Sequence, residues 1–597
     1  MCGITAFYSF APSAPLPLVN EVETVNDSML ARGPDGSGVW YSRDRSVALA
    51  HRRLAIIDLS DSGAQPMSDV AGSVIITFNG EIYNYRELRA ELEALGTQFR
   101  SSSDTEVILH LYNTFGVSSV SRLRGMFSFA IWDCIRNRLF AARDHFGIKP
   151  LYYSERDGRI AIASQVKSLS RLTWVGKQVD VVARGAFYLL GYVPDPLTIY
   201  SNIKSLAAGS YLTVDQESGV SISKYYDVSN VIAGTGGFSS NLLGDTGRER
   251  FASLLRDSVR CHLIADVPTG VFLSSGLDSA TITALATEVA GDGINTVTLA
   301  FEEYKNTQWD ESYLAEEIAC VYGTKHRRIT ISETEFKEHL CRILTAMDQP
   351  TIDGVNSYFI SLAAREAGLK VALSGLGGDE LFAGYPSFWQ VPLMVSSTKP
   401  FATVPSLGKS IGDFLAKFGS SGSSSKQTRL LQYGTSYNGA YFLKRGLFMP
   451  EELPSILGVD ESLFVLEKLS LLSELGATIH EIGSPRGRVT ALELTWYMRS
   501  QLLRDSDWAS MAHSLEIRTP LVDVRLFEGC LSLMKEGCIT KGEMANVPSR
   551  ELPQSVLRRK KTGFVVPIYR WLREEAGGVR GAEWGPKDWA KFVVNQF

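Results

Sequence analysis

The pattern of apolar residues changes at a Gly/Ser-rich stretch in the middle of the chain, and this change limits the folds that the chain can adopt. Residues 233–241 have the sequence AGTGGFSSN, a composition typical of a linker. Before this stretch, short β-branched runs alternate with turn residues; after it, strand-like and helix-like segments alternate. A chain of 597 residues is also too long for one hydrophobic core. We therefore expect two domains of different architecture, with the main boundary in this stretch.

The first half has the signature of an antiparallel, sheet-rich domain. The run 73–78 is β-branched and apolar and is expected to stop at Asn79-Gly80. Two further runs, 127–132 and 139–142, flank a polar turn at 133–138. We place this domain at residues 2–215, followed by a linker at 216–245.

The second half alternates strands and helices. The strand-like run 270–273 precedes a helix from Ser279, the run 296–301 precedes a helical segment at 311–321, and a helical segment at 355–367 precedes the run 370–373. Such alternation is typical of a parallel sheet with helices on both faces. We expect an α/β domain over residues 246–597.

Composition and charge exclude several classes of function. A net charge of −5 provides no field that would attract nucleic acid. The first 31 residues contain no Lys or Arg, and no apolar stretch reaches the ~18 residues that a membrane span needs. The seven cysteines form no CxxC pairs, and we interpret them as reduced thiols, six of which serve in packing. We expect a cytoplasmic protein that binds neither nucleic acid nor membrane.

Cys2 is a candidate nucleophile because it follows the initiator Met. Its small neighbours in MCGIT are compatible with removal of Met1, which would leave an α-amine and a thiol on one residue. An α-amine has a pKa near 8, so it can act as the base for its own nucleophile.

Other residues of the first half fit a free amino acid beside Cys2. Asn79 and Gly80, in FNGEIYN, offer a side-chain amide and a flexible backbone N–H, as an oxyanion hole requires. Arg53 can bind a carboxylate with two hydrogen bonds, and Asp104 can pair with an ammonium.

Two strand-to-loop turns in the second half indicate a nucleotide site. Ser274-Ser275-Gly276-Leu277-Asp278-Ser279 opens a helix, whose N-terminus and small residues suit a phosphate. A similar turn, at 374–380 (SGLGGDE), supplies Asp379. Asp278 and Asp379, at the carboxyl ends of parallel strands, are candidate ligands of a magnesium ion that accompanies a triphosphate.

The motifs of the first half, in chain order, resemble the class II glutamine amidotransferase domain: MCGI, RGPDGSG, HRRLAIIDL, AQPM, FNGEIYN, SSSDTEVI and LRGMFSFAIWD. The resemblance implies an α+β N-terminal-nucleophile (Ntn) hydrolase sandwich. It further implies that Cys2 attacks glutamine, that Asn79 and Gly80 stabilise the oxyanion, and that Arg53, Glu81 and Asp104 hold the substrate.

The motifs of the second half resemble the synthetase domain of asparagine synthetase: SSGLDS, SGLGGDELFAGY, YMRSQLLRDSDWASMAHSLEIRTPLVD and RRKKTGF. The resemblance implies an adenine-nucleotide-binding α/β domain that uses ATP and Mg²⁺ to adenylate a carboxylate, leaving AMP and pyrophosphate. Lys561 would stabilise charge during adenylation. The implied ATP-binding residues are Leu273, Ser274, Ser275, Gly276, Asp278, Ser279, Leu299, Ser374 and Gly375.

The acceptor carboxylate is not determined by these motifs. Aspartate, giving asparagine, is the leading hypothesis because this domain combination most often has that assignment. Asparagine synthetases, however, commonly carry an acidic residue where this chain has Leu376, and segment 348–356 lacks the Thr-Thr and nearby Arg that hold aspartate. A sugar acid, a polysaccharide or a natural-product intermediate therefore stays open as the acceptor.

Two further classes of function are weighed against this one. An intramolecular ligase resembling β-lactam synthetase would not need the intact Cys2, Asn79 and Asp104. A non-catalytic binding protein would not need both Asp278 and Asp379. A homodimer is compatible with the family resemblance, but oligomeric state is not written in the sequence.

Overall fold

The computed structural model describes residues 2–239, 241–291, 293–307, 309–403, 405–418, 425–559, 566–572 and 584–597. Most of the RRKKTGF motif falls outside the described residues. Among the described residues, none of the helices combines the length and the apolar character that a membrane crossing needs.

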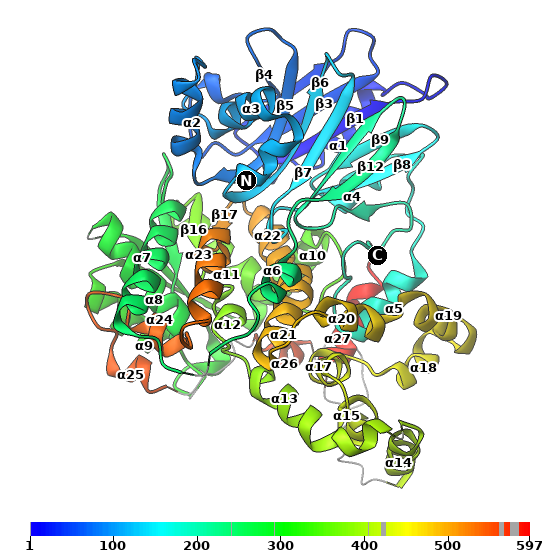
Figure 1. Ribbon diagram of the computed structural model, residues 1–597, viewed down its shortest axis with the longest axis vertical. Helices are drawn as coiled ribbons and strands as arrows, with labels where there is room; N and C mark the ends of the chain where they lie inside the picture. The colour runs from blue at the N-terminus through cyan, green and yellow to red at the C-terminus, as the bar shows by residue number, and fades with distance from the viewer. Residues whose placement is uncertain are drawn as a thin grey trace.

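The N-terminal domain contains two antiparallel six-stranded sheets (Figure 1). The first has the order β10-β8-β9-β1-β3-β2 and the second β12-β11-β7-β6-β5-β4. The strands of the first sheet are β1 (Gly3–Ser9), β2 (Gly36–Tyr41), β3 (Val47–Arg53), β8 (Tyr152–Arg156), β9 (Arg159–Ala163) and β10 (Lys204–Ser205). Those of the second are β4 (Met67–Ser68), β5 (Val74–Ile82), β6 (Gly125–Asp133), β7 (Arg138–Arg143), β11 (Ser210–Asp215) and β12 (Gly219–Lys224).

Side chains that point alternately to the two faces of each sheet build a four-layer sandwich. Ile4 and Tyr8 of β1 face the core between the two sheets, whereas Phe7 faces the core beneath α1. Ile75 and Ile76 of β5 divide in the same way, Ile75 between the sheets and Ile76 towards α2 and α3. Both faces of each sheet are therefore covered, as the predicted Ntn hydrolase sandwich requires. The helices of this domain are α1 (Val19–Asp27), α2 (Tyr85–Ala94), α3 (Asp104–Phe115), α4 (Val166–Leu169), α5 (Val181–Leu190), η1 (Asp61–Gly63) and η2 (Gly116–Arg122).

Two boundaries differ from the prediction. Strand β5 does not stop at Asn79-Gly80 but continues to Ile82, because both residues pair with β6, Asn79 with Ser128 and Gly80 with Phe127. The range 216–245, predicted to be linker, begins with β12, which pairs with β11 along its whole length. This edge strand has the sequence GVSISK, whose largely exposed polar residues resemble a loop.

The C-terminal domain is built on a parallel five-stranded sheet of order β15-β14-β13-β16-β17, with helices on both faces. Leu273, just after β13, packs against α8 and α9, whereas Phe272 packs against α11 on the other face. This confirms the predicted α/β architecture. The strands are β13 (Thr269–Phe272), β14 (Asn295–Phe301), β15 (Lys325–Ile331), β16 (Val371–Leu373) and β17 (Glu516–Arg518).

Helices make up the rest of the C-terminal half. In the first part they are α6 (Val228–Ala233), α7 (Asp245–His262), α8 (Leu277–Ala290), η3 (Glu302–Tyr304), α9 (Ser312–Tyr322), α10 (Glu333–Ala346), α11 (Val355–Glu366), α12 (Gly378–Leu381), α13 (Ser387–Thr398), η4 (Lys399–Thr403) and α14 (Pro405–Phe418). They continue with α15 (Ser425–Thr428), α16 (Leu430–Tyr433), α17 (Tyr437–Arg445), η5 (Pro450–Glu452), α18 (Pro454–Leu457), α19 (Val459–Leu469), α20 (Leu471–Ile479) and α21 (Pro485–Leu492). The last are the π-helical η6 (Glu493–Leu503), α22 (Arg504–Met511), η7 (Pro520–Val522), α23 (Val524–Met534), α24 (Lys541–Ala545), α25 (Gln554–Leu557), α26 (Ile568–Trp571) and α27 (Pro586–Val594).

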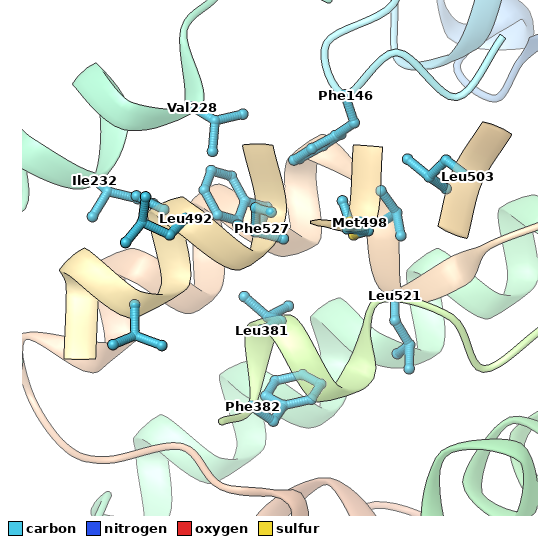
Figure 2. Packing of buried hydrophobic residues seen from close by; sticks show 14 of the residues in the cluster. Phe146, Val228, Ile232, Leu381, Phe382, Leu492, Met498, Leu503, Leu521 and Phe527 are labelled. Carbon is cyan, nitrogen blue, oxygen red and sulfur yellow. The ribbon is translucent and has the colours of Figure 1, made fainter. Parts of the chain in front are cut away.

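A shared apolar cluster joins the two domains. Phe146, from the loop after β7, lies among residues of α12, η6 and α23 (Figure 2). Its ring meets that of Phe527 edge to face, with the centroids 5.4 Å apart. The predicted linker is also anchored, because Val228 and Ile232 of α6 are buried in the same cluster. The two domains therefore share a hydrophobic core in addition to being connected by the chain between them.

All seven cysteines are free, as predicted. Cys320 and Cys341 are exposed, so the prediction that they serve in packing is wrong for these two.

Candidate active sites

Cys2 lies at the start of β1, where the two sheets meet. Its backbone nitrogen, the atom that removal of Met1 would turn into an α-amine, donates to Asn79 Oδ1 at 2.9 Å. Its Sγ lies 3.9 Å from the carbonyl oxygen of Leu54. Burial raises the pKa of the Cys2 thiol, so the thiol needs a base to become a nucleophile.

The predicted oxyanion residues lie beside Cys2. Asn79 is fully buried, and with its oxygen engaged by Cys2 its Nδ2, 3.5 Å from Ser128 Oγ, is the group left to donate. Gly80 has a φ of +154°, and a Cβ there would lie 2.1 Å from the carbonyl oxygen of Met126. Only glycine fits this position on β5.

The three predicted glutamine-binding residues line one small cavity with Cys2. The cavity measures about 30 Å³, and Arg53, Gly80, Glu81 and Asp104 lie in its wall. Asp104 Oδ2 accepts the Ile82 N–H at 3.0 Å, and burial raises the pKa of Asp104 to about 7. The Arg53 guanidinium donates to the backbone carbonyls of Asp58 and Ser60.

Two buried arginines, whose roles were not foreseen in the sequence, tie this site to the C-terminal domain. Arg518 of β17 pairs with Glu81 at 3.0 Å and with Glu516 at 2.6 Å. Arg32 donates to the Cys2 carbonyl oxygen at 3.1 Å and forms a two-pronged ion pair with Asp507 at 2.7 and 2.9 Å. Both arginines lie in the motifs quoted above, RGPD and SLEIR. The partners that connect them to the other domain, Asp507 for Arg32 and Glu81 for Arg518, lie hundreds of residues away in the chain.

The two predicted nucleotide turns meet at the carboxyl ends of β13 and β16. A Cβ on Gly375 would lie 2.9 Å from Asp278 Cβ, and one on Gly378 would lie 2.4 Å from Asp278 Oδ1. Glycines at these positions therefore allow the second turn to touch the first.

Together the turns bound a cavity of about 350 Å³. Ser275 is 3% exposed and is not among the residues that line it. The other predicted ATP-binding residues do line it: Leu273, Ser274, Gly276, Asp278, Ser279, Leu299, Ser374 and Gly375.

Lys541 of α24 is a third participant that the sequence did not reveal. Its ammonium pairs with the carboxylates of both Asp278 and Asp379. Burial acts to lower the pKa of Lys541, but the two carboxylates outweigh it and the net shift is upwards. The two predicted magnesium ligands are thus close enough to share one cation. Two carboxylates, completed by phosphate and water oxygens, form a donor set that suits Mg²⁺.

Lys561, predicted to act in adenylation, lies outside the described residues.

Besides residues of the nucleotide turns, the wall of the 350 Å³ cavity contains carboxylates, neutral polar side chains and apolar side chains. Asp353 and Asp505 lie in this wall, as do Leu376 and Leu502. Thr351 Oγ1 donates to Asp505 Oδ2 at 2.8 Å and accepts the Asp353 N–H at 3.2 Å. We call the part of the wall that Asp353, Asp505, Leu376 and Leu502 form the acceptor end.

Comparisons with known proteins agree with this two-site geometry. The glutamine amidotransferase domain family matches residues 1–226, and the asparagine synthase family matches residues 250–581. Asparagine synthetase [glutamine-hydrolyzing] 1 of Bacillus subtilis is 32% identical over 96% of this chain and 88% of its own length. The chain belongs to the glutamine-hydrolysing asparagine synthetase family.

Further relatives include a second asparagine synthetase and a protein named as an amidase. Asparagine synthetase [glutamine-hydrolyzing] 3 of B. subtilis is 31% identical over 94% of this chain and 87% of its own length. Amidase chry2 of Gibberella zeae is 30% identical over 65% of this chain and 60% of its own length. Among solved structures, the glutamine phosphoribosylpyrophosphate amidotransferase of B. subtilis covers 55% of this chain and 81% of its own, with 16% identity and a TM-score of 0.29, which is too low to bear on the fold.

Membership of this family makes the chain a glutamine-hydrolysing carbon–nitrogen ligase. The family also implies that it uses ATP. Which carboxylate is amidated does not follow from relatives at this level of identity.

Proposed function

We propose that the protein adenylates a carboxylate with ATP and Mg²⁺ in its C-terminal domain and amidates it with ammonia from glutamine, releasing AMP and pyrophosphate. The observation that carries the proposal is that one chain holds the Cys2 cavity and the Asp278–Asp379 cavity, joined by buried ion pairs.

At the first site, removal of Met1 would give the α-amine as a base. The amine takes the thiol proton as Cys2 Sγ attacks the side-chain amide carbon of glutamine. Asn79 Nδ2 and the Gly80 N–H stabilise the oxyanion, while Arg53, Glu81 and Asp104 bind the carboxylate and ammonium of glutamine. The amine returns the proton to the departing nitrogen as ammonia, and water then hydrolyses the thioester to release glutamate.

At the second site, the turn 274–276 and the N-terminus of α8 bind phosphate through backbone N–H groups. Asp278 and Asp379 would hold magnesium, which would offset the charge of the triphosphate. Lys541, which pairs with both aspartates, would be placed to contact the same phosphates. The acceptor carboxylate attacks the α-phosphorus, pyrophosphate leaves, and Lys561 offsets the developing charge. Ammonia then attacks the acyl carbon, and AMP leaves.

Aspartate is the first candidate acceptor, because relatives that match most of the chain are named asparagine synthetases. A different carboxylate is the second candidate, and a specific observation favours it. Leu376 lies in the acceptor end of the cavity, and among the described residues that line the cavity there is no Lys, Arg or His. A ligase resembling β-lactam synthetase is less well supported, since Arg53, Gly80, Glu81 and Asp104 line the cavity at Cys2 and Asn79 accepts the Cys2 N–H.

The proposal is tested by pyrophosphate release with ATP, magnesium and glutamine, in the presence and absence of aspartate. Aspartate-dependent release would support the first candidate, and release that requires another acid would support the second. Cys2→Ala should lose glutamine-supported amide formation but keep formation supported by ammonium chloride. Full glutamine-supported activity in that variant would refute the role of Cys2.

Location in the cytoplasm and assembly as a homodimer also stay predictions. Light scattering on the purified protein would test the second.

A further inference from the structure

Two carboxylates in the acceptor end of the cavity are held in place by the surrounding structure. Thr351 bonds to both residues, donating to the Asp505 side chain and accepting the Asp353 N–H. Trp508 Nε1 donates to Asp505 Oδ1 at 2.9 Å, and the Gly354 N–H donates to Asp353 Oδ1 at 2.8 Å. The positions of both carboxylates are therefore fixed before any acceptor binds.

A glycine allows these carboxylates to approach each other. Gly354 has a φ of +90°, and a Cβ there would lie 2.5 Å from Trp508 Cζ2 and 3.2 Å from Asp505 Cβ. The turn that carries Asp353 can thus lie directly against α22, which carries Asp505.

The charge of this pair is not balanced by a basic residue of the described cavity wall. Lys541 pairs with Asp278 and Asp379 at the phosphate end instead. Burial raises the pKa of Asp353. Burial and the charge of Asp353 raise the pKa of Asp505 to about 7, although the Trp508 hydrogen bond and the charge of Arg504 oppose the rise. Two close carboxylates of this kind favour a ligand that brings a positive charge.

The cavity wall also contains the polar residues Asn356, Ser357 and Ser506 together with apolar side chains. Leu376 projects from the second nucleotide turn, and Leu502 and Ile360 also line the cavity. A second carboxylate on the acceptor would lie near Asp353 and Asp505 with no Lys, Arg or His in the described cavity wall to pair with, so its desolvation would be poorly compensated.

We propose that the acceptor is a carboxylic acid that carries an amine and no second carboxylate, and that Asp353 and Asp505 bind the amine while the carboxylate faces ATP. This inference rests on the proposed adenylation. Asp353 and Asp505 determine specificity under this proposal, whereas Leu376 contacts the apolar body of the acceptor.

ATP–pyrophosphate exchange tests the inference, because it reports adenylation without glutamine or ammonia. Three panels are compared with the full-length protein and magnesium: monocarboxylic acids with an amine, the same acids with the amine acetylated, and dicarboxylic acids that include aspartate and glutamate. We expect exchange with members of the first panel to exceed that with the others by at least about tenfold, equivalent to ~1.4 kcal/mol.

Asp353→Asn should remove most of this preference by raising the KM of the amine-bearing acid, and Asp353→Glu should partly restore it. Asp460→Asn, which makes the same charge change at an exposed position of α19, is the matched control and should behave like the wild type. Thermal unfolding verifies that each variant is folded.

Equal or better exchange with aspartate or with the acetylated acids would overturn the inference but leave adenylation intact. A preference unchanged in Asp353→Asn would also overturn it. No exchange with any acid would count instead against the proposed function, and the inference would fall with it.

Discussion

Replacement of Arg518 by Met should damage both the domain interface and glutamine binding. Arg518 is fully buried and lies between Glu81 of the N-terminal domain and Glu516 of its own strand. Burial raises the pKa of Glu81 and Arg518 opposes that rise. Burial also acts to raise the pKa of Glu516, but several positive charges, of which Arg518 is the largest contributor, more than reverse this effect. Methionine keeps much of the side-chain volume but removes the guanidinium that the two carboxylates share.

The magnitude follows from the distances. At 3.0 Å and an effective dielectric constant of about 20, one ion pair is worth about 5.5 kcal/mol before desolvation. Removal of one partner of a buried pair typically costs about 3–5 kcal/mol. Protonation of the carboxylates limits this loss. For domains of this size we expect a fall in melting temperature of about 6 °C or more.

Glutamine binding should fall in a way that depends on pH. Without Arg518 the pKa values of Glu81 and Glu516 both rise, so at neutral pH Glu81 is less available to bind the ammonium of glutamine. We expect the KM for glutamine to rise by about tenfold or more near pH 7 and the defect to shrink as pH increases and the carboxylate ionises. Glutamate release across a pH series measures both effects.

Arg518→Lys is the control, because it keeps the charge but cannot reach both carboxylates with a planar fork. The melting temperature of Arg518→Lys and its KM for glutamine should lie between those of the wild type and those of Arg518→Met. A melting temperature and a glutamine KM unchanged in Arg518→Met would refute the reasoning. A KM defect that does not vary with pH would refute the part assigned to Glu81.

Three further predictions concern single residues. Lys541→Met leaves Asp278 and Asp379 facing each other. Added magnesium should therefore raise the melting temperature of the variant more than that of the wild type. An equal rise in both proteins would contradict the geometry in which the two aspartates share one cation. Burial raises the pKa of Asp104 to about 7, above its value in the unfolded chain. The stability of the wild type should therefore fall as pH rises through about 7, whereas that of Asp104→Asn should not. Parallel curves of melting temperature against pH for the two proteins would argue against the raised pKa of Asp104. Gly375→Ala places a Cβ 2.9 Å from the Cβ of Asp278. The affinity for ATP should therefore fall about tenfold or more, while glutaminase activity stays unchanged. An unchanged ATP affinity in a binding titration would show that the two turns can separate.

Local patterns predicted the architecture where they are strong. The short, mostly apolar runs of β6, β7, β13, β14 and β16 mark strands whatever the tertiary context. Local patterns failed where a contact with a distant segment decides the conformation. Asn79-Gly80 resembles a turn, yet pairing with β6 keeps it in the strand.

The sequence by itself predicted the residues of the two proposed sites that lie in local motifs. Cys2, Asn79, Gly80 and Asp104 lie in short motifs, as do Asp278 and Asp379, because a nucleophile, an oxyanion hole and a phosphate turn each depend on residues close together in the chain.

Only the tertiary structure decided how these sites are connected and charged. The Arg32–Asp507 and Arg518–Glu81 pairs join residues separated by more than 400 positions, and the Lys541 bridge joins two turns to a distant helix. Electrostatic energy depends on distance and burial in space, and neither can be calculated from separation along the chain. For the same reason, the proximity of Asp353 and Asp505, on which our inference about the acceptor depends, becomes visible only in the folded protein.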